Sequence, residues 1–325
     1  MIYLKDNKEG IKNLPEKSIN LIIADPPYYK IKGDFDFIFK NFQEYLDFIE
    51  EQANLYKRVL KDNGSLFVYG HARNIAYVQV IFDKYFNLIN NLVWEKLDCQ
   101  TKKGIANFKC FPPITERILF YSNEVLNTGL EEIHNNPNLF LSIKKYMRNE
   151  RDRIRKDKGF DTLEKFNQYI NEVTETSSIV SKHYFSDSQY CPPTEIIYKK
   201  LQSTGYFRRE YEDLRREYED LRRYFNNKNN LYDVIRCSQE SNITKKFDHD
   251  TIKPIKLTIQ LIETTTREND LVLIPFGGSG TECISCIRTN RKFISFENNE
   301  KYFNIAYKRI QDELDSIQLL RKETL

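Results

Sequence analysis

The apolar run of residues 19–24 ends directly in Asp25-Pro26-Pro27-Tyr28, and this junction constrains the fold more than any other feature. Consecutive prolines fix φ and remove N–H donors, so a strand that ends here leaves the Pro26 carbonyl free to accept a hydrogen bond. A carboxylate, a carbonyl and an aromatic ring then share one sheet edge. Such a set suits a flat ligand with an exocyclic amino group. The alternative is an ordinary strand followed by a proline-rich turn with a surface tyrosine.

A second strand, Leu271-Val272-Leu273-Ile274, runs into a glycine-rich turn near the other end of the chain. Glycines there allow positive φ and let a ligand approach the backbone. The next expected strand ends at Glu297, about where an acidic residue meets ribose hydroxyls in nucleoside-binding α/β folds. The order of strand, glycine turn, helix, strand and acid therefore predicts a nucleoside-binding unit.

Together these motifs resemble the S-adenosylmethionine-dependent amino-methyltransferases of DNA, in the permuted order of the beta class. In that family the catalytic tetrapeptide comes first, a target-recognition region follows, and the glycine turn for the cofactor comes last, as it does here. The resemblance covers roughly residues 1–125 and 245–310. Further matching stretches are Leu4-Lys5-Asp6, residues 56–66, residues 116–121 and His249-Asp250-Thr251-Ile252-Lys253-Pro254.

Two positions depart from the pattern of the family. The family usually has an aspartate before Pro-Phe in the glycine motif, and here that position holds Ile274. Loss of this carboxylate would weaken binding of the cofactor's methionine part, unless another acid takes over. A tryptophan that is common after the catalytic loop is replaced by Phe35. Because the catalytic tetrapeptide is intact, we expect an active enzyme and regard its cofactor affinity as the open point.

Alternating strand and helix patterns at both ends of the chain predict an α/β fold with a mainly parallel, doubly wound sheet. With the resemblance, this is a Rossmann-like methyltransferase fold in circularly permuted order, with an inserted, mainly helical recognition module. We expect a catalytic half at 1–125, the insertion at 126–244 and a cofactor-binding half at 245–325. The expected strands are 2–5, 19–24, 65–69, 88–94, 117–121, 271–275 and 293–297, and the expected helices are 42–60, 73–86, 254–265, 281–288 and 299–320.

Ligands of open parallel sheets bind at the carboxyl ends of the strands. Both motifs follow strands, so they can share one pocket despite their distance in sequence. The resemblance implies that Asp25, Pro26, Pro27 and Tyr28 are catalytic: Tyr28 stacks on a flipped base, and Asp25 and the Pro26 carbonyl accept the hydrogens of its amino group. S-adenosylmethionine is the implied cofactor, and no metal is expected. The residues implied to bind the cofactor are Asp6, Asp25, Lys253, Pro275, Phe276, Gly277, Gly278, Ser279, Gly280, Thr281 and Glu297.

The insertion is charged and mainly helical in pattern. Segments 162–173 and 178–185 resemble a helix-turn-helix that presents its second helix to a DNA groove, and a plain helical insertion is an equal alternative. A repeat places Tyr211, Leu214, Tyr218 and Leu221 on one helix face. We expect a strut that packs on the catalytic domain, or a spacer whose arginines contact phosphates. The DNA-binding candidates are Ser178, Ser181, Lys182, His183, Arg208, Arg215 and Arg222.

Composition limits the remaining classes. A net charge of +3 is only mildly basic, so any DNA surface must be a local patch. No apolar run approaches about 18 residues and the amino terminus lacks the shape of a signal peptide, which predicts a soluble, cytoplasmic protein without a membrane partner. The resemblance implies a protein of bacterial or phage type. Cys283-Ile284-Ser285-Cys286 is a C-x-x-C, but no second pair lies at zinc-finger spacing, so we expect core packing.

In the resembling families the Asp form of the tetrapeptide goes with adenine N6, and the Ser form with cytosine N4. We therefore expect a site-specific adenine-N6 methyltransferase of double-stranded DNA, from a restriction-modification system or a solitary methylase. A cognate restriction endonuclease and a homodimer are the further partners that the family suggests. Cytosine-N4 methylation and a catalytically silent DNA-binding relative are the alternatives. A nucleotide-binding oxidoreductase would explain the glycine turn but not residues 25–28.

Overall fold

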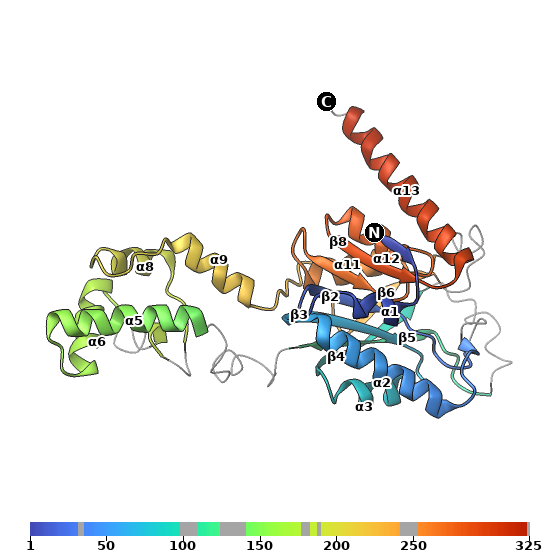
Figure 1. Cartoon of the computed structure of the whole chain (residues 1–325), viewed down its shortest axis with the longest axis horizontal. Coiled ribbons are helices and arrows are strands. Elements are labelled where there is room, and N and C mark those ends of the chain that lie inside the picture. Colours follow the sequence, from blue (N-terminus) through green and yellow to red (C-terminus); the bar gives the residue numbers. More distant parts are fainter. Residues whose placement is uncertain are drawn as a thin grey trace. The chain divides into compact units, whose positions relative to one another are not determined.

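The computed structural model describes residues 1–31, 36–97, 109–123, 141–176, 183–186, 190–240 and 252–323. The chain separates into two compact units, one of Met1–Glu124 with Tyr224–Leu325 and one of Val125–Arg223 (Figure 1). Several candidates from the sequence lie outside the described residues: Phe35, Ser178, Ser181, Lys182 and His249.

In its described part, the first unit is built on an eight-stranded sheet with the order β1-β8-β7-β2-β3-β5-β4-β6. Neighbouring strands are parallel, except that β5 runs antiparallel to β3 and β4. The expected mainly parallel α/β sheet is thereby confirmed. The strands are β1 (Ile2–Leu4), β2 (Ile19–Ala24), β3 (Leu60–Gly70), β4 (Asn87–Lys96), β5 (Thr115–Ser122), β6 (Val234–Cys237), β7 (Leu271–Ile274) and β8 (Lys292–Glu297).

Helices cover both faces of this sheet. Successive side chains of β2 point to opposite faces, so Ile22 and Ala24 enter one apolar core while Leu21 and Ile23 enter the other. The first core packs against α1 (Asn7–Lys12), α2 (Phe42–Val59) and α3 (Ile75–Phe82). The second packs against α11 (Ile255–Thr265), α12 (Thr281–Arg288) and α13 (Glu300–Glu323). A strand buried on both faces explains the continuous apolar run before the tetrapeptide.

The topology brings the two sequence motifs together. Strands β2 and β7 are parallel neighbours, with Leu21 opposite Val272 and Ile22 opposite Leu273. The tetrapeptide follows β2 and the glycine turn follows β7, so both leave the sheet at the same edge. Strand β8 lies on the other side of β7 and ends there at Glu297. The carboxyl ends of three adjacent strands therefore supply the candidate site.

The second unit has its own helical core. Its described helices are α5 (Leu141–Lys158), α6 (Leu163–Thr174), α8 (Glu195–Gln202) and α9 (Tyr211–Leu221). The stripe of the sequence repeat lies on α9, where Leu214 is 1% exposed and Tyr211 and Tyr218 are half-buried against the same core. The expectation that this stripe packs on the catalytic domain is wrong, because its partners are the helices of its own unit.

Three local features differ from the sequence expectations. Strand β6 extends the sheet from residues that we had placed in the helical insertion, and residues 224–240 belong to the first unit. It is only four residues long and pairs with β4, with Ile235 opposite Trp94. Helix α1 was not expected, and β3 begins at Leu60 rather than after Gly64. By contrast, Cys283 and Cys286 are fully buried in the second core, as predicted.

No helix in the described residues is long and apolar enough to cross a membrane.

Candidate active site

The loop after β2 is held in a strained conformation. Tyr29 and Lys30 both have positive φ, at 58° and 55°, a conformation that side chains other than glycine rarely adopt. Asp36 fixes the bend from across the loop: its carboxylate accepts the Tyr28 N–H at 2.5 Å, and its carbonyl accepts the Lys30 N–H at 2.7 Å. The Asn74 side-chain amide donates to the carbonyls of Tyr28 and Tyr29. These bonds hold the tetrapeptide in one position.

Asp25 is the centre of a buried charge network. Its Oδ1 accepts a hydrogen bond from the Tyr28 hydroxyl, and its Oδ2 lies 2.8 Å from the Lys253 Nζ. The Lys253 ammonium, 4% exposed, also contacts the Tyr28 hydroxyl at 3.2 Å and Glu116 Oε2 at 3.3 Å. An ammonium has three donors, so the protein itself uses all of them. The other Glu116 oxygen pairs with Lys96.

The network fixes the protonation states of its members. Burial opposes ionisation of Glu116, but the ammonium groups of Lys253 and Lys96 hold its pKa below the ordinary value. Burial would likewise lower the pKa of Lys253, yet Asp25 and Glu116 raise it above the ordinary value. Burial and the charges of Asp25 and Glu116 raise the pKa of Tyr28, so its hydroxyl keeps the proton that it donates. Two cations and two carboxylates therefore balance in this network.

The glycine turn after β7 is closely packed. A Cβ on Gly277 would approach the Ser295 Oγ to 2.9 Å. Gly280 has φ of +81°, and a Cβ there would lie 3.0 Å from the Ala306 Cβ, closer than ordinary van der Waals contact. The Gly278 N–H donates to the Glu297 carboxylate at 2.8 Å. The Asn299 N–H donates to the other oxygen of Glu297 at 2.8 Å. The backbone thus aims a partly buried carboxylate at the space beside the turn.

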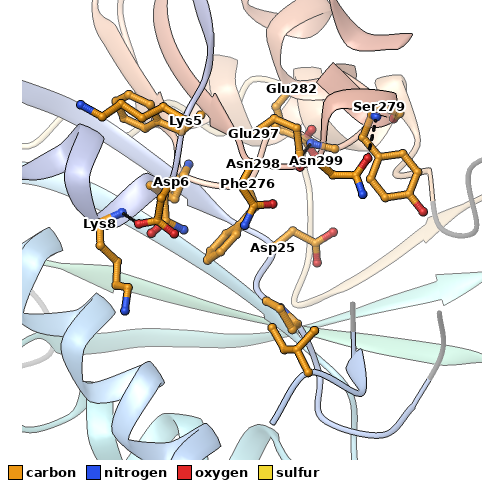
Figure 2. Close-up of a pocket in the computed structure, with 18 of the residues that line it drawn as sticks. Lys5, Asp6, Lys8, Asp25, Phe276, Ser279, Glu282, Glu297, Asn298 and Asn299 are labelled. Atoms are coloured by element: carbon orange, nitrogen blue, oxygen red, sulfur yellow. Dashed lines mark hydrogen bonds between the residues drawn. The ribbon is translucent and has the colours of Figure 1, made fainter. Parts of the chain in front are cut away.

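These elements surround one cavity of about 540 Å³. Figure 2 shows Asp25 and Phe276 in the middle of its wall, with Asp6 and Lys8 on one side and Ser279 on the other. Of the residues implied to bind the cofactor, nine line it: Asp6, Asp25, Lys253, Pro275, Phe276, Gly277, Gly278, Ser279 and Glu297. Pro27 also lines it, whereas Pro26, Tyr28, Gly280 and Thr281 are not part of its wall.

Asp6 has a structural partner that the sequence did not predict. It caps α1, and its carboxylate accepts the N–H groups of Lys8 at 2.9 Å and Glu9 at 3.4 Å. The sequence also gave no reason to select Lys96, Glu116 or Glu282 for the site. Glu116 stands beside Arg117 near the start of an otherwise apolar strand, and Glu282 interrupts a stretch of small and apolar residues, so an acidic residue within a mostly apolar segment was the available signal.

The candidates for DNA contact lie in the second unit. Arg208, Arg215 and Arg222 are exposed, and Arg215 is bonded to Glu212 at 2.9 Å on its own helix. His183 is half-buried, and its backbone carbonyl accepts the Cys191 N–H. Helix α6 lies where the first helix of the expected helix-turn-helix was placed, but most of the second lies outside the described residues.

Comparisons with known proteins give relatives along nearly the whole chain. The type II methyltransferase M2.LlaDCHI of Lactococcus lactis subsp. cremoris is 25% identical over 328 residues, which cover 94% of this chain and 87% of the relative. The DNA adenine methyltransferase YhdJ of Escherichia coli (strain K12) is 22% identical over 302 residues, covering 92% and 79%.

Solved structures agree on the fold. The M1.HpyAVI–SAM complex matches with a TM-score of 0.53 and 21% identity, covering 95% of this chain and 98% of that chain. The cytosine-N4-specific PvuII DNA methyltransferase matches with a TM-score of 0.52 and 16% identity, covering 97% and 91%. The sequence model of the family N6_N4_Mtase, described as DNA methylase, matches residues 19–308. Because this match spans most of the chain, the protein belongs to the N6_N4_Mtase family of DNA methylases.

Proposed function

We propose that the chain is a site-specific DNA methyltransferase that transfers the methyl group of S-adenosylmethionine directly to adenine N6. The observation that carries the proposal is the meeting of Asp25 with the glycine turn and Glu297 at one cavity. A carboxylate that can accept amino hydrogens thus lies beside a pocket of nucleoside-binding type. The silent alternative has less support, because the tetrapeptide is intact and its carboxylate opens onto the cavity.

The cavity suits the cofactor in its size and in the chemical groups that line it. A volume of about 540 Å³ lies within the usual range for small-ligand sites, about 300–1,000 Å³. The two backbone N–H groups on Glu297 orient its carboxylate, which can accept the two ribose hydroxyls. Phe276 supplies an apolar wall for the purine ring. When bound, S-adenosylmethionine supplies a methyl group on a positively charged sulfur.

Asp25 and the Pro26 carbonyl are the proposed acceptors for the amino group of the target base. Each carboxylate oxygen has two lone-pair positions. Tyr28 and Lys253 occupy one position on each Asp25 oxygen, so a further position remains for an incoming N–H. Hydrogen bonds from both amino hydrogens draw the nitrogen lone pair out of conjugation and aim it at the methyl carbon. Positioning of this kind can supply ~7–11 kcal/mol of the acceleration.

Lys253 is proposed here as a positioning residue rather than a direct cofactor ligand. All three of its donors are directed at Asp25, Glu116 and Tyr28. Glu116 in turn is anchored by Lys96, so the orientation of the Asp25 carboxylate depends on the antiparallel pair β4–β5. A carboxylate that is held in one orientation loses no freedom when the base binds, which favours the reacting geometry.

Adenine is the proposed base because the tetrapeptide has its Asp form. The relative from Escherichia coli is named a DNA adenine methyltransferase, which agrees with this choice. The resemblance to the cytosine-N4-specific structure is at 16% identity and concerns the fold.

We propose that the helical unit contacts DNA, with Arg208, Arg215 and Arg222 on phosphates. A restriction endonuclease partner and a homodimer stay predictions.

Long-read sequencing that detects modified bases tests the proposal and finds the recognition site at the same time. DNA from cells that express the chain is compared with DNA from cells that express Asp25→Ala. We expect methylated adenine in one short motif with the wild type and none with the variant. Methyl marks on cytosine would replace the proposed base while keeping the transfer reaction. Absence of marks with a folded, expressed protein would favour the silent alternative.

A further inference from the structure

An acidic side chain that neither motif includes opens onto the cavity. Glu282 is the second residue of α12, and it is 7% exposed where it lines the pocket. Within the described part of the chain, its carboxylate makes no hydrogen bond or ion pair with another residue. A buried carboxylate without such a partner is costly, because burial disfavours its charged form. This cost points to a missing cationic partner.

The acid is absent from the place where the resembling family usually has it. Ile274, at the end of β7, is fully buried in the second core, and its side chain is not part of the cavity wall. The strand therefore supplies an apolar side chain to the core beside the glycine turn. Glu282 lies in the first turn of the helix that follows the same glycine turn, and it faces the same cavity. A carboxylate is thus still present at this end of the pocket.

The groups around Glu282 show at which end of the cavity it lies. Burial, and next the nearby charge of Asp25, raise the pKa of Glu282 to about 7. Figure 2 shows Glu282 on the side of the wall away from Asp6, and the charge of Asp25 acts on it, so Glu282 lies toward the end of the cavity where the methyl-bearing sulfur must come. The charged and titratable groups around it are Asp25, Lys253, Arg309, Tyr69, Cys283 and Cys286. Lys253 already bonds to three other groups, and Arg309 donates to the Ser279 carbonyl.

We propose that Glu282 binds the ammonium group of the cofactor's amino-acid part, in place of the acid that the chain lacks at Ile274. The inference rests on the proposed function, since it assumes that the cavity holds S-adenosylmethionine. The ribose at Glu297 and the methyl group at Asp25 leave the amino-acid part on the Glu282 side. An ammonium there gives the carboxylate the charge-assisted hydrogen bond that it lacks in the protein alone.

Calorimetric titration of the full chain with two ligands tests this assignment. S-adenosylhomocysteine carries the ammonium group, whereas 5′-methylthioadenosine keeps the nucleoside and lacks the amino-acid part. We expect Glu282→Gln to weaken S-adenosylhomocysteine about 10–100-fold, as for loss of a hydrogen bond to a charged group, and to leave methylthioadenosine within about twofold. Glu268→Gln, on the exposed turn before β7, is the matched control and should change neither affinity.

The outcomes separate the inference from the function on which it rests. Equal weakening of both ligands would assign Glu282 a structural role, and unchanged affinity for both would remove it from the site. Either result overturns the inference and leaves the proposed function standing. If the folded wild type binds neither ligand, the proposed function fails as well.

Discussion

Replacement of Lys253 by methionine tests the buried charge network. Methionine has a similar length and no charge, so Asp25 loses its cation and Glu116 keeps only Lys96. Lys253 is 4% exposed and lies within 3.3 Å of both carboxylates; its pair with Glu116 is buried, whereas Asp25, 24% exposed, faces the cavity. Removal of one partner from a buried pair typically costs about 3–5 kcal/mol, since it leaves an uncompensated charge. We expect a loss of this size in the free energy of unfolding near pH 8.

The fluorescence of Trp94 reports this loss. It is the chain's single tryptophan, and it is buried in β4, in the same unit as Lys253. A loss of 1 kcal/mol lowers the melting temperature by about 2–4 °C in a domain of this size, so we expect a decrease of about 6–20 °C. Lys256→Met is the matched control: Lys256 is exposed in the first turn of α11, and its replacement should change the melting temperature little.

The pH dependence gives the prediction a second test. In the wild type the pKa of Glu116 is held below its ordinary value of 4.5, so its contribution to stability is complete above pH 4.5 and is lost as the pH falls through the lowered pKa. In Lys253→Met, Glu116 loses one of the two ammonium groups that lower its pKa, so it can bind a proton at higher pH. The difference between wild type and variant should therefore shrink as the solution is acidified below about pH 4.5. A melting temperature within 2 °C of the wild type at pH 8 would refute the reasoning.

Three further results are expected. Tyr28→Ala should lower kcat/KM about 10–100-fold through loss of stacking, while Tyr28→Phe should cost less than tenfold; equal losses in steady-state assays would assign the role to the hydroxyl instead. Because the pKa of Glu282 is about 7 and its ionised form is the proposed ligand, affinity for S-adenosylhomocysteine should fall about tenfold from pH 8 to pH 6, and a flat calorimetric profile would contradict this. Leu214→Ala should destabilise the helical unit by about 2–5 kcal/mol, seen as faster hydrogen exchange in α5, α6 and α8; unchanged exchange there would show that α9 contributes little.

The sequence predicted those parts of the candidate site that consist of residues close together in the chain. The tetrapeptide and the glycine turn each follow an apolar strand, and the rule that ligands lie at carboxyl strand ends joined them correctly. The contacts of Lys253 were not predictable in this way. They join the segment before α11 to β5, and the position of Glu116 depends on antiparallel pairing deep in the sheet. No short-range pattern encodes such a contact.

The sequence also did not show which surface each helix or strand packs against. The spacing of Tyr211, Leu214 and Tyr218 gave the buried face of α9 but not the surface that it covers. Strand β6 has four residues, too few for a periodic pattern, and it forms because β4 offers it an edge. Glu282 was passed over for a related reason, because it sits in a helix whose other residues pack in the core.

The central claim is transfer of a methyl group to adenine N6 with Asp25 as the acceptor for the amino hydrogens. Its most direct test is incubation of the purified chain with unmethylated genomic DNA and S-adenosylmethionine carrying a deuterated methyl group, followed by nucleoside mass spectrometry. The account predicts labelled N6-methyladenine with the wild type and none with Asp25→Ala. Label on cytosine, or equal label with the variant, would contradict it.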